Sequence, residues 1–169
     1  MKKTLTVILL IVPVAALFGC KADRPANTAA SSGNETRPSA VTEARRSAFI
    51  DAIQRGNIQE VERLIAEGFD VNTENEGGVT ALMIASGMNV EAARVLIMRG
   101  ARVNTRTSGG YTALMSAALN GQKDAVKLLL DSGADPNIKD ASNRTAMKYA
   151  EEKNNKQITE ILKRAGAKG

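Results

Sequence analysis

The chain has 169 residues, of which 43% are hydrophobic and 24% charged, and its formal net charge is +5. Histidine is absent and cysteine occurs once, so Ser-His-Asp and Cys-His catalysis, histidine metal sites, cysteine zinc clusters and an intramolecular disulfide are excluded. Aromatic residues make up only 3%, which favours closely packed helices with a core of Ala, Leu, Ile, Val and Met.

Residues 1–19 have the pattern of a secretory signal. Lys2 and Lys3 form a positive start, and an almost unbroken apolar run follows from residue 5 to residue 18. A membrane-spanning helix needs about 20 apolar residues, and Pro13 interrupts this run. A cleaved signal is therefore favoured over an anchor helix.

The apolar run ends in Leu17-Phe18-Gly19-Cys20, so the one cysteine directly follows a small residue. This segment resembles the lipobox of bacterial lipoproteins, although Phe18 is bulkier than the residue usual there. The resemblance implies cleavage before Cys20 and lipidation of Cys20, and several acyl chains hold a protein firmly at a membrane. In lipoproteins of Gram-negative envelopes, Asp directly after the cysteine usually means retention in the inner membrane. Lys21 stands there in this chain, so the resemblance favours the outer membrane, with the body facing the periplasm. An ordinary signal peptide with an incidental cysteine is the alternative.

Residues 20–42 are expected to be the lipidated cysteine and a flexible tether. Pro25, Pro38 and Gly33 stand among scattered polar residues, and no apolar period is present. The folded body is expected over residues 43–169.

The body repeats itself about every 33 residues. Glycines follow successive apolar helical stretches, at spacings of 32, 33 and 33: Gly68, Gly100, Gly133 and Gly166. Three of these stretches are preceded by similar boxes that begin at Thr80, Thr112 and Thr145. We expect each threonine to cap a helix and each glycine to adopt a positive φ after the second helix of its unit.

This period, with a turn and two helices per unit, resembles ankyrin repeats over residues 43–169. The family's Thr-Pro-Leu-His-x-Ala box recurs with Ala at positions 81, 113 and 146 in place of Pro, and with Met, Met and Lys at positions 83, 115 and 148 in place of His. The resemblance implies an all-α repeat solenoid of about four ankyrin repeats, each a helix-turn-helix with a hairpin loop. Residues 43–72 lack the threonine box and are expected to form the N-terminal cap, and polar residues 151–156 mark the C-terminal cap.

Two features of the body leave alternatives open. The second unit is one residue short at Gly87-Met88-Asn89, which indicates either a tighter turn or a reshaped partner contact. Five methionines have helical spacing, which favours core packing over a metal or oxidation role: Met83, Met88, Met98, Met115 and Met147.

Ankyrin proteins bind other proteins through their hairpin tips and the concave face formed by the first helices. Carried over by position, the expected tip contacts are Glu74, Asn75, Glu76, Arg106, Thr107, Ser108, Tyr111, Lys139, Asp140 and Arg144. The expected contacts on the concave helix ends are Gln54, Arg55, Ser86, Leu119, Asn120, Glu152 and Lys153. Tyr111 is the preferred contact because an exposed aromatic offers rigid contact area, and packing along its own hairpin is the alternative.

Charge is unevenly distributed along the body. Residues 43–91 hold nine acids and four bases, a net charge of −5, whereas residues 92–169 hold fourteen bases and seven acids, a net charge of +7. This polarity either steers a partner of opposite arrangement or reflects solvated helix faces. A nucleic-acid partner is not expected, because the chain carries a secretion signal and lacks interleaved aromatics.

Small ankyrin lipoproteins of this layout resemble immunity proteins paired with phospholipase effectors of type VI secretion. The resemblance implies a monomeric binder that occludes a lipase effector at the membrane. The sequence contains no paired-carboxylate constellation, phosphate-binding loop or nucleophile elbow, so no catalytic residue, metal or cofactor is expected. A periplasmic ankyrin scaffold or oxidative-stress protection factor is the alternative.

Overall fold

The computed structural model describes residues 40–168, and this part of the chain contains eight helices, with one isolated bridge between Glu74 and Thr80. The helices form four successive pairs: α1 (Ala40–Arg55) and α2 (Ile58–Ala66), α3 (Ala81–Met88) and α4 (Val90–Met98), α5 (Ala113–Leu119) and α6 (Lys123–Asp131), α7 (Ala146–Glu152) and α8 (Lys156–Arg164). α1 begins three residues before the predicted start of the body, so the end of the predicted tether is helical.

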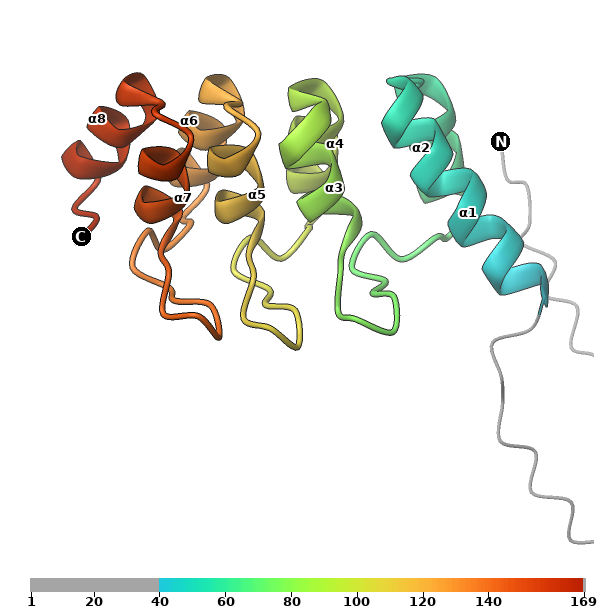
Figure 1. Ribbon diagram of the computed structural model, residues 1–169. Helices are drawn as coiled ribbons and strands as arrows, with labels where there is room; N and C mark the ends of the chain where they lie inside the picture. The colour runs from blue at the N-terminus through green and yellow to red at the C-terminus, as the bar shows by residue number, and fades with distance from the viewer. Residues whose placement is uncertain (1–39, 169) are drawn as a thin grey trace, which may run out of the picture. The chain divides into compact units, whose positions relative to one another are not determined.

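The pairs stack in series (Figure 1). α1, α3, α5 and α7 form one row in which each helix packs against the next, and α2, α4, α6 and α8 form the second row in the same way. Three hairpin loops, residues 74–79, 106–111 and 139–144, project from one side of the stack between successive pairs. This arrangement confirms the predicted all-α repeat solenoid.

Threonine caps the first helix of three pairs, as predicted. The hydroxyls of Thr80, Thr112 and Thr145 accept the backbone N–H three residues on, at 3.3, 3.4 and 3.4 Å. Each hydroxyl thereby satisfies one of the amide groups that a helix start leaves without an intrahelical partner. The threonine box thus marks helix starts correctly.

The second helix of each pair ends two residues before the predicted glycine. The backbone φ lies between +83° and +88° at Gly68, Gly100, Gly133 and Gly166. Residues other than glycine adopt this conformation only with strain. The chain turns at this point toward the next hairpin, or toward the C-terminus after Gly166.

An asparagine that follows each of the first three of these glycines ties its unit to the next one. The Nδ2 of Asn104 donates to the carbonyl of Gly133 at 2.9 Å, and its Oδ1 accepts the N–H of Asp135 at 2.9 Å. Asn72 and Asn137 make the same pair of bonds to the following unit. These amides couple neighbouring units on the loop side of the second row, a function that the sequence analysis did not anticipate.

Small and aliphatic side chains form the core between the rows. Ala85, Ala117 and Ala150 occupy the same position of three first helices and are 0% exposed, which allows the helices to approach closely. Met83, Met115 and Met147 are buried, as predicted. The core prediction is wrong for Met88 and Met98, which are 57% and 75% exposed because they are the last residues of α3 and α4.

The short second unit has a tighter turn between its helices, which was one of the two interpretations of its missing residue. Asn89 alone joins α3 to α4: its N–H donates to the carbonyl of Ala85 at 2.7 Å, and its Oδ1 accepts the N–H of Ala92 at 3.0 Å. The other pairs are joined by two or three residues that include one with positive φ. One asparagine therefore ends the first helix and begins the second.

Candidate protein-binding surface

Each hairpin is held in shape by one polar side chain at the same repeat position. The Oδ1 of Asn75 accepts two backbone N–H groups of its own loop at 2.9 and 3.0 Å, and the Oδ1 of Asp140 does so at 2.8 and 2.9 Å. The hydroxyl of Thr107 accepts one such N–H at 3.0 Å. These three predicted contact residues therefore use their side-chain oxygens to shape the hairpins.

The hairpins also bond to one another. The N–H of Ser108 donates to the carbonyl of Gly77 at 3.2 Å, and the N–H of Ala141 donates to the carbonyl of Gly109 at 2.8 Å. The Nη2 of Arg106 donates to the carbonyl of Lys139 at 3.0 Å. The tips are thus ordered before any partner arrives, which reduces the entropy lost on binding.

A polar cluster ties the third hairpin to α7. The hydroxyl of Tyr149 donates to Oδ2 of Asp140 at 2.6 Å, and the Nε of Arg144 donates to the same oxygen at 3.1 Å. The guanidinium carbon of Arg144 lies 4.4 Å from the centre of the Tyr149 ring. The Asp140 side chain, a predicted tip contact, is only 6% exposed, so it offers little side-chain surface to a partner.

The electrostatics of this cluster follow from its burial. Burial raises the pKa of Tyr149 to about 12, and its hydrogen bond to Asp140 acts in the same direction. Burial alone would raise the pKa of Asp140, but hydrogen bonds from Tyr149 and from the backbone of Arg144 and Ser142 lower it overall. At neutral pH the cluster therefore consists of a carboxylate, a neutral phenol and a guanidinium.

Tyr111 packs inside the stack. Its ring meets that of Tyr149 edge to face, with the ring centroids 5.6 Å apart, and the residue is half-buried against the core. Of the two alternatives for Tyr111, the structure supports packing, although the partner ring comes from the next unit and not from its own hairpin.

The remaining predicted contacts divide by exposure. The exposed residues are Gln54, Arg55, Glu74, Asn75, Glu76, Arg106, Ser108, Asn120, Lys139, Glu152 and Lys153. Thr107, Leu119 and Arg144 are half-buried.

Ser86 is the predicted contact that the structure excludes. It is 0% exposed, as is Ala118 at the same position of α5, because α3 packs against both α4 and α5. Its hydroxyl is buried and has no hydrogen-bond partner among the described residues. A buried side chain cannot contact a partner, so this prediction is wrong.

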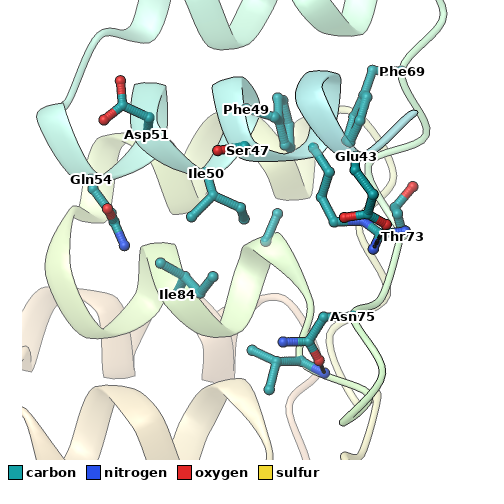
Figure 2. A pocket seen from close by; sticks show the side chains of 13 residues that line it. Glu43, Ser47, Phe49, Ile50, Asp51, Gln54, Phe69, Thr73, Asn75 and Ile84 are labelled. Carbon is teal, nitrogen blue, oxygen red and sulfur yellow. Dashed lines mark hydrogen bonds and ion pairs between the residues drawn. The ribbon is translucent and has the colours of Figure 1, made fainter. Parts of the chain in front are cut away.

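A pocket of about 380 Å³ opens between α1, α3 and the first hairpin (Figure 2). Ile50 of α1 and Ile84 of α3 line its middle, and Gln54 lies at one end, away from Glu43 and Thr73. Its apolar lining residues are Phe49, Ile50, Phe69, Val79, Ala81 and Ile84, and its polar lining residues are Glu43, Arg46, Ser47, Asp51, Gln54, Thr73 and Asn75.

The pocket lies where the stack of hairpins begins. Ser108 and Ala141 each donate an N–H to the hairpin before their own, but the corresponding N–H of Glu76 has no partner among the described residues. α1 occupies this end in place of an earlier hairpin, and Glu43 and Arg46 lie beside the loop of Asn75 and Glu76. This pocket was not predicted from the sequence, although the missing threonine box of the first unit was a signal for it.

The charged side chains that line the pocket form ion pairs, and one carboxylate beside the pocket does not. Arg46 donates from Nη1 to Glu43 at 2.8 Å, and its buried Nε has no hydrogen-bond partner among the described residues. Asp51 pairs with Arg55 at 2.9 Å. Glu76, which lies beside Glu43 and Arg46, forms no ion pair within residues 40–168 and so adds an unpaired carboxylate next to the pocket.

No helix of residues 40–168 is long and apolar enough to cross a membrane. In that range no three His, Cys, Asp or Glu side chains gather as a metal site. The predicted signal, Cys20 and most of the tether lie outside the described residues.

Comparison with known proteins identifies the family. The model for ankyrin repeats matches three overlapping stretches, residues 14–107, 49–140 and 106–168. The chain belongs to the ankyrin-repeat family. Ankyrin repeats are protein–protein interaction modules and are generally non-enzymatic, which fits the stacked helical pairs and hairpins described above.

Two curated relatives share part of the repeat region. The chain is 32% identical over 93 residues to the mitochondrial disaggregase of Homo sapiens and, to the same extent, to that of Bos taurus. The match covers 55% of this chain but only 9% of each relative. The similarity is therefore confined to a small part of those proteins.

Proposed function

We propose that this ankyrin-repeat protein is a lipid-anchored envelope protein that binds a membrane-targeting phospholipase effector of type VI secretion and neutralises it by occlusion. The observation that carries the proposal is the preformed binding surface, in which the hairpins are bonded to one another through Ser108 and Ala141. The choice of effector rests on the resemblance of the layout, a lipobox-like Cys20 followed by a tether and a short ankyrin body.

The expected mechanism is steric. A rigid surface docks over the entrance of the lipase active site without contributing catalytic groups. Acyl chains on Cys20 would keep the binder at the membrane on which the lipase acts, and confinement there raises the effective concentration of the pair. The proposed location is the outer membrane, with the body in the periplasm.

Charge supports directed docking. The acidic first half and the basic second half of the body form a dipolar surface, and a partner of opposite polarity would be steered into one orientation. Such steering raises the association rate and weakens with salt.

The test uses a candidate lipase encoded next to this gene, anionic phospholipid vesicles and the full-length protein. We expect lipid hydrolysis to stop at one binder per enzyme. The variant Cys20→Ser should still inhibit the purified enzyme but should fail to protect cells, because it is not held at the membrane.

Two results would contradict the proposal. The first is undiminished hydrolysis with micromolar binder present. The second is a deletion strain that becomes sensitive to peroxide but not to the effector, which would support the stress-protection alternative.

A further inference from the structure

The lining of the pocket between α1, α3 and the first hairpin indicates which side chains of a partner it can bind. We infer that it receives one large apolar side chain of the bound protein, carried on a segment with a lysine or arginine next to that side chain. This inference rests on the proposed protein-binding function and adds the recognition chemistry of one site.

The apolar requirement comes from the pocket lining. Ile50 and Ile84 are only partly buried, and they line the pocket from two different helices (Figure 2). A volume of about 380 Å³ is near the lower limit for ligand pockets, so it suits an anchoring side chain better than a whole helix. Anchors of this kind dominate binding energy at protein interfaces.

The basic flank follows from an unpaired carboxylate next to the pocket. Glu76 lies with Glu43 and Arg46 beside the Asn75 loop, is exposed, and forms no ion pair within the described residues. The nearby cations, Arg46 and Arg55, are already paired with Glu43 and Asp51. Lysine or arginine next to the anchor could therefore pair with Glu76 without displacing an existing partner.

The chain's own tether does not supply such an anchor. Residues 21–39 contain no Val, Leu, Ile, Met, Phe, Tyr or Trp. A second copy offers Met98, which is 75% exposed and precedes Arg99, so self-association is an outcome that the experiment must separate.

The experiment follows the methyl NMR signals of Ile50 and Ile84 in the full-length protein, held in a neutral detergent. The probe is a synthetic peptide with one Leu-Phe pair between two Lys-Lys pairs in a Gly-Ser background. We expect its addition to shift both signals and to leave Ile158 of α8 unchanged. Replacing Leu-Phe by Ala-Ala should weaken binding at least tenfold, and replacing the lysines by glutamates should abolish it at low salt.

Matched variants on α1 test the position. Ser47 is exposed and lines the pocket, whereas the adjacent Ala48 is exposed and does not line it. Ser47→Trp should fill the pocket and weaken peptide binding at least tenfold, and Ala48→Trp should leave it unchanged. Circular dichroism of both variants verifies that the helices are retained.

The inference would be overturned if the peptide did not shift the signals of Ile50 and Ile84, or if the two tryptophan variants had equal effects. It would also be overturned if the shifts depended on protein concentration and disappeared in Met98→Ser, or if deletion of residues 21–39 itself shifted the signals.

The two proposals fail separately. If Ser47→Trp still inhibits the lipase fully, the pocket inference fails and the proposed function stands. If the peptide binds as described but no lipase is inhibited, the proposed function fails and the pocket inference stands.

Discussion

The bond between Tyr149 and Asp140 allows a quantitative test of how the last units are held together. Tyr149→Phe removes the hydroxyl that donates to Oδ2 of Asp140 at 2.6 Å but keeps the ring against Tyr111 and Arg144. A hydrogen bond to a charged group contributes about 1.5–3 kcal/mol. Because Arg144 still donates to the same oxygen, we expect a loss near the lower limit of that range.

The assay is urea unfolding at pH 7, followed by circular dichroism, with a double-mutant cycle. Tyr149→Phe should lower the free energy of unfolding by about 1.5 kcal/mol in the wild-type background. In the Asp140→Asn background it should cost less than about 0.5 kcal/mol, because the carboxylate acceptor is already gone. Asp140→Asn retains an Oδ1 for the hairpin N–H groups, so the loop itself is preserved.

The same bond predicts a pH dependence. The pKa of Asp140 is lowered in the folded protein, so its contribution to stability is fully present above the ordinary aspartate pKa of about 4 and is lost as pH falls through the folded value. The difference between wild type and Tyr149→Phe should therefore shrink below about pH 4. An unfolding free energy unchanged by Tyr149→Phe at pH 7, or an equal loss in both backgrounds, would refute the reasoning.

Three further substitutions test the stack. Asn104→Ala removes two hydrogen bonds to the next unit and should lower the free energy of unfolding by about 2 kcal/mol in urea unfolding; a loss under about 0.5 kcal/mol would show that water replaces them. Gly133→Ala meets no atom within 4 Å but places a Cβ at φ +87°, so thermal unfolding should show a loss of about 1 kcal/mol, and an unchanged melting temperature would disprove the strain. Ser86→Ala removes a buried hydroxyl without a described partner and should stabilise the protein by about 1 kcal/mol; destabilisation would mean that the hydroxyl has a partner.

The periodic features of the fold could be predicted from sequence because each has a local physical cause. Thr80 marks a helix start through its hydroxyl, and Gly100 marks a helix end through its positive φ. Both effects act within a few residues and recur at a fixed interval. The resulting repeat was sufficient to predict the stacked helical pairs.

Features that depend on contacts between units could not be predicted in this way. Ser86 and Asp140 occupy positions that are polar in sequence, yet neighbouring helices and hairpins bury their side chains. Asn104 bonds to groups about thirty residues away, so no local pattern indicates its function. The pocket at Ile50 and Ile84 arises because α1 replaces a hairpin, which only the three-dimensional arrangement shows.

Site-specific photo-cross-linking in living cells tests most directly whether the hairpin side of the stack binds another protein. A photo-reactive residue at Glu76 or Lys139 samples exposed hairpin positions, and one at Lys127 samples the exposed surface of α6 in the other row. We expect a single partner to be captured from Glu76 or Lys139 and not from Lys127. Capture of that partner from Lys127 alone, or equally from all three positions, would contradict it.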